Sequence, residues 1–124
     1  MSTAPKKISR GDVVLLPIAF VSGAGSKVRP ALVVQGDHLN RRLNSTVVAV
    51  ITTTNKRASR EASQLFVDIS TPDGQLTGLL HDSTVKAEHL DTVDQRDIVR
   101  VIGRFSDALM QQVESCIKSA LRFS

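Results

Sequence analysis

One arginine lies where it could hold a phosphate group. Arg29 follows a glycine- and serine-rich stretch over residues 22–27 and directly precedes Pro30. A proline restricts the residue before it to an extended backbone, so the guanidinium has a stiff base beside a loop. A guanidinium can present two parallel N–H donors to a phosphate. The pattern is also typical of an arginine at a strand entrance that pairs with a surface carboxylate, and both interpretations remain open.

A run of hydroxyl side chains follows a second apolar segment. Residues 47–51 are all aliphatic, and Thr52, Thr53, Thr54 and Asn55 come directly after them. Threonine at a strand end can reflect β-propensity alone. Its hydroxyl can also donate a hydrogen bond to a phosphate oxygen. Thr52, at the strand exit, is therefore a second candidate for phosphate contact.

Other chemistries have little support in the sequence. The three histidines, His38, His81 and His89, are not paired at a metal-ligand spacing, so no metal is expected. No glycine-rich phosphate-binding motif is present, and no cofactor is expected. Cys116 lies on an apolar helical stripe, which favours burial over a nucleophilic role. A single cysteine excludes an internal disulfide and is typical of a reducing compartment, so we expect a cytoplasmic protein.

The charge is distributed unevenly along the chain. Residues 1–60 contain ten Lys or Arg against two acids, a net charge of +8, whereas residues 61–124 contain six against ten, a net charge of −4. The net charge of +4 indicates a polyanionic partner, most commonly nucleic acid. A surface with scattered, solvated Lys and Arg would give the same charge balance, so this interpretation also remains open. No run of about 18 apolar residues predicts a membrane span.

The hydrophobic pattern predicts several short strands and one closing helix. We expect strands over residues 12–18, 31–34, 47–51, 65–69, 83–90 and 98–105, with turns over 36–44 and 72–74. Pro17 should end its strand or lie at an edge. Ser106 is a good N-cap for a helix whose apolar residues recur every four positions, at Leu109, Val113, Ile117 and Leu121.

These elements define the expected fold class and domain organisation. Crossover helices are missing, which excludes a parallel α/β fold. The expected fold is mainly β with a C-terminal helix (α+β): a small, strongly bent antiparallel sheet, as in a partly closed barrel. At 124 residues the chain is long enough for one core, so we expect a single domain over 10–124 behind a flexible tail over 1–9.

Several short motifs occur together in a specific order. Arg10-Gly11-Asp12-Val13 opens the first strand, and Arg29-Pro30 with the apolar residues 31–34 opens the second. Val50-Ile51-Thr52 ends the third, residues 82–94 form a later strand and turn, and Gly103-Arg104-Phe105-Ser106 leads into the last helix. In this order and spacing, over residues 10–121, the chain resembles the MazF/PemK (Kid) toxin family.

The resemblance implies a fold, an activity and partners. It implies a Src-homology-3-like barrel with a C-terminal helix that forms a homodimer. It also implies a metal-independent, sequence-specific endoribonuclease that cleaves single-stranded RNA, including mRNA, and so inhibits translation and growth. Such toxins belong to type II toxin–antitoxin systems, and an antitoxin neutralises them by laying an extended acidic segment across the RNA groove.

The resemblance also assigns residues. Arg29 and Thr52 fall on the active-site Arg and Thr of the family, and Lys86 and Glu88, with His89 adjacent, fall on a further basic residue and acid. The loop over residues 22–27 has neither the Glu nor the His found in many members, and Lys86 replaces an Arg of the plasmid members. Catalysis would fall to Arg29, Thr52 and Glu88, with Glu88 as base and His89 as the alternative base. RNA binding would fall to Lys27, Arg41, Arg42, Thr53, Lys56, Arg57, Lys86 and His89, with limited stacking on Phe20.

Two other functions are weaker alternatives. A non-catalytic toxin of the same fold could bind a target such as gyrase, but residues 121–124 lack the aromatic-glycine tail expected of one. A helix-turn-helix DNA binder over residues 94–122 would need a first helix where residues 98–105 are β-branched.

Overall fold

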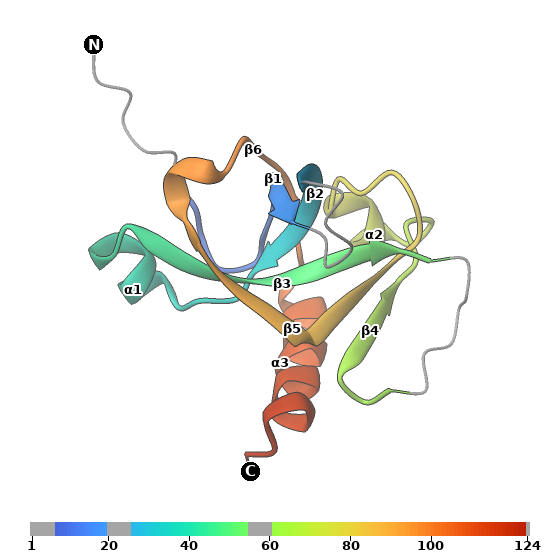
Figure 1. Ribbon diagram of the computed structural model, residues 1–124. Coiled ribbons are helices and arrows are strands. Elements are labelled where there is room, and N and C mark those ends of the chain that lie inside the picture. Colours follow the sequence, from blue (N-terminus) through green and yellow to red (C-terminus); the bar gives the residue numbers. More distant parts are fainter. Residues whose placement is uncertain (1–6, 20–25, 55–60, 124) are drawn as a thin grey trace.

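The computed structural model describes residues 7–19, 26–54 and 61–123. Within them, one antiparallel sheet curls into a half-barrel around which the helices are arranged (Figure 1). Its strands are β1 (Asp12–Ala19), β2 (Ser26–Val33), β3 (Ser45–Thr53), β4 (Gln64–Val67), β5 (Ser83–Asp94) and β6 (Arg100–Arg104), in the order β4-β5-β3-β2-β1-β6. The helical elements are α1 (Asp37–Arg42), α2 (Pro72–Leu76), η1 (Gln95–Asp97) and α3 (Asp107–Leu121). The predicted fold class is confirmed.

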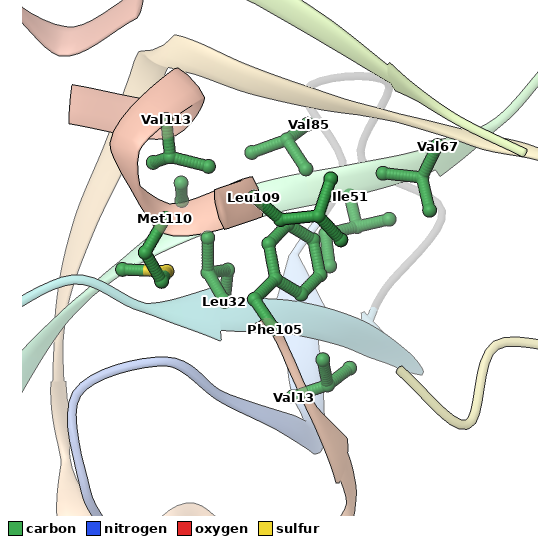
Figure 2. Close-up of a cluster of buried hydrophobic side chains, with 10 residues drawn as sticks. Val13, Leu32, Ile51, Val67, Val85, Phe105, Leu109, Met110 and Val113 are labelled. Atoms are coloured by element: carbon green, nitrogen blue, oxygen red, sulfur yellow. The ribbon is translucent and has the colours of Figure 1, made fainter. Parts of the chain in front are cut away.

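The sheet carries an apolar core on each face. The first core, between the sheet and α3, is centred on Phe105, with strand residues such as Leu32 and Ile51 facing Leu109 and Val113 of the helix (Figure 2). The second core, on the opposite face, contains the side chains Ile8, Val14, Leu16, Ala31, Val33, Val48 and Ile98. Successive strand residues point to opposite faces, so the continuous apolar runs in β2 and β3 supply both cores. Ile8, within the predicted tail, packs into the second core.

Helix α3 begins where the sequence predicts. The Ser106 side chain accepts a hydrogen bond from the backbone N–H of Leu109 at 3.2 Å, which satisfies one of the free donors of the first turn. Val113 and Cys116 are buried, whereas Leu121, at the C-terminal end of the expected stripe, is exposed. Burial, together with the nearby charge of Glu88, raises the pKa of the Cys116 thiol, which agrees with a packing role.

A bulge bends β5 sharply (Figure 1). Lys86 pairs with Val50, but the next pair joins Leu90 to Ala49, which leaves residues 87–89 without partners on β3. An insertion of this kind kinks the strand that carries it. The first half of β5 therefore lies between β3 and β4, while the second half pairs with β3 alone.

The chain between α2 and β5 crosses close to β6, the edge strand at the far side of the sheet from β4. A Cβ on Gly78 would lie 2.0 Å from the carbonyl oxygen of Ile102, and a Cβ on Gly103 would lie 2.4 Å from that of Thr77. Gly78 also has a φ of +73°, which L side chains rarely adopt. Two glycines thus allow two backbones to touch and link the two edges of the sheet.

Some elements differ from the expectation. Short helices α1 and α2 occupy the segments predicted as turns, and β2 begins at Ser26, inside the predicted loop. The cause of the earlier start is β1, which continues to Ala19 and supplies partners for the added residues. Pro17 faces no strand on its β6 side, because β6 pairs only with Asp12–Leu15, so its predicted edge position is confirmed. No helix in the described ranges is long and apolar enough to cross a membrane.

Candidate active site and nucleic-acid interface

The strand register shows which side chains share the face opposite α3. One complete row runs across five strands: Val14 pairs with Ala31, Ala31 with Val50, Val50 with Lys86, and Lys86 with Gln64. Directly paired residues point to the same face. Because Val14 and Ala31 belong to the second core, Lys86 and Gln64 lie on that face too.

A second row lies two residues further along each strand, and here the face becomes polar. Leu16 pairs with Arg29, Thr52 pairs with Thr84, and Thr84 pairs with Phe66. The β2–β3 register, continued from Ala31 and Val50, brings Arg29 level with Thr52. Paired strands are about 4.8 Å apart, so Thr52, Thr84 and Phe66 form one short row, and Arg29 lies on the same face of β2, just beyond the last β2–β3 pair.

Pro30 sets the backbone around Arg29. Val34 donates its N–H to Val47 of β3 at 2.9 Å, and alternate residues of a strand face the same neighbour, so Pro30 also faces β3. Proline has no N–H to donate, and the β2–β3 pairing ends at Ala31. Arg29 therefore lies within β2 and pairs with β1, rather than at a loop–strand junction as the sequence predicts.

The Arg29 side chain is half-buried, and its Nε atom is shielded from solvent. A guanidinium held in this way loses less conformational entropy when it binds a phosphate than an arginine on a mobile loop. The geometry therefore suits a guanidinium that is already oriented when a phosphate binds.

Two threonine hydroxyls accompany the guanidinium. Thr52 is half-buried and Thr84 is 6% exposed, and neither side-chain hydroxyl has a hydrogen-bond partner in the described part of the chain. Both can therefore donate to an incoming oxygen. Sequence reasoning missed Thr84, although its two-residue spacing from Lys86 places the two residues on one face of a strand.

Glu88, the predicted base, has other partners. Its carboxylate accepts hydrogen bonds from Ser63 at 2.9 Å and from Gln64 at 2.6 Å, at the start of β4. Partial burial raises the pKa of Glu88, but the bonds from Gln64, its own backbone amide and Ser63, with the charge of Lys86, outweigh burial and leave that pKa below its usual value. A carboxylate with a low pKa is a weak proton acceptor. Both of these hydrogen-bond donors belong to β4 or the residue before it, not to the strands that carry Arg29 and Thr52.

The remaining predicted RNA-binding residues fall in several places. Lys27 is exposed and lies two positions before Arg29, on the same face. Lys86 is half-buried on that face, and His89 is exposed in the β5 bulge. Thr53 pairs with Ser83 and so points to the opposite face from Thr52. Lys56, Arg57 and Phe20 lie outside the described residues.

Arg41 and Arg42 lie at the other end of β3. Both are exposed at the C-terminal end of α1, which precedes Ser45, about 23 Å from Thr52 along the strand. The Gln95 side chain fixes this helix, because its amide donates to the carbonyls of Asn40 and Ser45 at 3.0 Å. An RNA that touched both regions would have to run the length of β3.

The described residues contain no group of three or more His, Cys, Asp or Glu side chains that could hold a metal ion. The sheet face opposite α3, where Arg29, Thr52 and Lys86 lie, is called the open face below. Its donors are instead guanidinium, ammonium and hydroxyl groups. These groups bind phosphate oxygens.

Fold and site together define a class: a small curled β half-barrel with guanidinium, ammonium and hydroxyl groups on the face opposite its C-terminal helix. The family model described as a PemK-like, MazF-like toxin of type II toxin–antitoxin systems matches residues 9–121. The chain belongs to this family of toxins.

Individual relatives agree with this assignment. Endoribonuclease EndoA of Bacillus subtilis (strain 168) is 30% identical over 115 residues, which cover 92% of this chain and 94% of the relative. Endoribonuclease MazF6 of Mycobacterium tuberculosis (strain H37Rv) is 28% identical, with coverages of 92% and 96%.

Solved structures share the fold. A mycobacterial endoribonuclease in complex with its cognate antitoxin aligns with a TM-score of 0.75 at 19% identity, over 94% of this chain and 97% of that one. A MazE–MazF structure from Deinococcus radiodurans aligns with a TM-score of 0.71 at 21% identity, over 96% and 100%. These likenesses confirm the predicted fold.

Proposed function

We propose that this toxin is a metal-independent, sequence-specific endoribonuclease that cleaves single-stranded RNA and so inhibits translation and growth. The names of the relatives favour RNA cleavage. The observation that supports the proposal for this chain is that Arg29 and Thr52 lie on the same face of neighbouring strands, two residues beyond the pair Ala31–Val50. One cation and one hydroxyl at that spacing suit a phosphodiester.

The chemistry needs no cofactor. The 2′ oxygen of the RNA forms a bond to the adjacent phosphorus, the bond from phosphorus to the 5′ oxygen breaks, and a 2′,3′-cyclic phosphate remains. Arg29 stabilises the negative charge that builds on the phosphorus oxygens, and Thr52 donates to a non-bridging oxygen. A guanidinium serves poorly in proton transfer, so the role of Arg29 is charge stabilisation. The 2′ hydroxyl loses its proton as it attacks, and the leaving 5′ oxygen takes a proton from water; Glu88 as the base that takes the 2′ proton stays a prediction.

The partners are proposed with the activity. We expect a homodimer, and a cognate antitoxin whose acidic extended segment covers the basic face. A net charge of +4 favours an acidic partner. Exposed Val99 and Val101 at the edge strand β6 favour self-association through that side. Light scattering of the purified chain, which gives the molar mass in solution, tests the homodimer. A cytoplasmic location also stays a prediction.

A direct assay tests the function. Purified protein is incubated with a long single-stranded RNA of defined sequence, with EDTA in excess, and the 5′ ends of the fragments are sequenced. We expect a few discrete cuts at one short sequence, each leaving a cyclic phosphate. Intact RNA under all conditions would refute the proposal, and inhibition of a gyrase supercoiling assay by the same protein would favour the non-catalytic alternative.

A further inference from the structure

The described phenylalanines occupy three different environments. Phe105 is fully buried in the first core, and Phe123 is exposed after α3. Phe66, on β4, is half-buried and belongs to neither core, although its neighbours Leu65 and Val67 both pack against the first one. Side chains alternate along a strand, so the Phe66 ring lies on the open face.

That ring ends the row that begins with Thr52. Phe66 pairs with Thr84, Thr84 pairs with Thr52, and Arg29 is level with Thr52. Two strand spacings separate Phe66 from Thr52, about 10 Å, and Arg29 lies on the neighbouring strand β2. A nucleotide whose phosphate rests between Arg29 and Thr52 therefore has a flat apolar surface within its reach, on the far side of Thr84.

We propose that Phe66 is the platform on which a base next to the cleaved bond stacks. The inference rests on the proposed function and names a residue that positions the RNA of that same site. Single strands are held by cations along the backbone and by aromatic rings under the bases. Lys86 lies one row away on the same face and supplies the charge beside the ring. Because the chain has only four aromatic residues, this single ring carries a large share of any stacking.

A mixed protein–RNA double-mutant cycle tests the proposal. The cleaved sequence is first mapped with the wild-type protein, and an oligoribonucleotide of that sequence is made uncleavable with a 2′-O-methyl group at the cleaved position. Each flanking base is then removed in turn to give an abasic site. We expect Phe66→Leu to weaken binding about tenfold, and one abasic position to weaken wild-type binding equally.

The coupling between the two changes is the decisive readout. At the stacked position the abasic change should cost the Phe66→Leu variant less than twofold, since the contact is already gone. With the cleavable RNA, Phe66→Leu should raise KM about tenfold and change kcat less than twofold, because the ring lies away from the reacting atoms. Phe66→Tyr should restore wild-type values.

Two controls separate the possible failures. Phe123→Leu removes an exposed ring outside the site and should bind as wild type, and thermal melts should show that both Leu variants are folded. The stacking proposal is wrong if wild-type protein cleaves RNA and the Phe66→Leu variant binds the RNA as tightly as wild type. It is also wrong if the effect of Phe66→Leu on binding adds to the effect of every abasic position. In both cases the proposed endoribonuclease function still stands. If wild-type protein cleaves no RNA, both proposals are wrong.

Discussion

The two faces of the sheet use the same strands for different purposes. On the face covered by α3, Ile51, Val67 and Val85 are buried in the first core. On the opposite face β2 and β3 are apolar as far as Ala31 and Val50 and then turn polar, whereas β1 continues with the buried Leu16. The site therefore begins where the second core stops, and the first core packs directly behind it.

This arrangement explains how exposed donors stay in place. Thr52, Thr84 and Phe66 alternate along their strands with Ile51, Val85 and Val67, whose side chains are locked in the first core. A backbone fixed on one face orients the side chains on the other. Substitutions on the covered face should therefore lower stability, and substitutions on the open face should lower activity.

The largest effect is expected where the backbones touch. Gly78→Ala adds a Cβ that would lie 2.0 Å from the carbonyl oxygen of Ile102, at a φ of +73°. Neither the clash nor the strain can relax locally, so we expect a loss of more than about 4 kcal/mol in the free energy of unfolding, measured by urea denaturation.

Gly36→Ala is the matched control. Its added Cβ would meet only the ring of the exposed His38, and its φ of −59° suits any residue, so we expect a loss below about 1 kcal/mol. Equal stability of the two variants would show that residues 76–78 do not press on β6.

The next effect belongs to the open face. Arg29→Ala removes the cation that stabilises the phosphate charge, and we expect kcat to fall by about 10²–10³ while the melting temperature changes by only a few degrees. Arg29→Lys keeps the charge but loses the fork of donors, so its activity should lie in between. Arg96→Ala, which removes an exposed arginine paired with Asp94, should cleave normally. Retention of cleavage by Arg29→Ala within tenfold would contradict the assignment.

Thr84 and Thr46 should respond in opposite ways. Thr84→Val keeps the shape and removes a hydroxyl without an internal partner, so we expect a five- to tenfold loss of kcat/KM and unchanged stability. The Thr46 hydroxyl is buried and donates to the Asn40 side chain at 2.6 Å. Thr46→Val should therefore cost about 1–3 kcal/mol of unfolding free energy and leave cleavage unchanged. If both variants lose only stability, Thr84 does not contact the RNA.

The sequence predicts the elements better than the register. The continuous runs in β2 and β3 and Ser106 as helix cap follow from local patterns that the structure confirms, whereas the strand predicted over residues 65–69 ends at Val67. The sequence does not predict that Arg29, Thr84 and Phe66 share one face, because this depends on pairing between strands far apart in the chain. The β5 bulge over residues 87–89 shifts that pairing, and no local signal marks it. Helix α1 is likewise held by Gln95, 55 residues after the Asn40 carbonyl to which it bonds.

The smallest effect concerns Glu88 and distinguishes its two possible roles. Its pKa is lowered in the folded state by hydrogen bonds from β4, so ionisation favours folding. The resulting stability is fully present above the ordinary pKa of 4.5 and is lost as the pH falls through the lowered value. Glu88→Gln should therefore destabilise the protein at pH 7, by less than about 1 kcal/mol because the group is exposed. Wild type and variant should converge in acid, once the pH has fallen below the lowered pKa of Glu88.

Activity separates the two roles of Glu88 more sharply than stability does. If the carboxylate only joins β4 to the β5 bulge, Glu88→Gln should cleave within about twofold of wild type at pH 7, which is the result we expect from its two hydrogen bonds to β4. A base contributes about 10²–10⁴-fold, so a loss of a hundredfold or more in kcat, with the acid limb of the pH–rate profile removed, would show that Glu88 takes the 2′ proton. Either result shows whether this face supplies both the base and the phosphate-binding groups, or only the phosphate-binding groups.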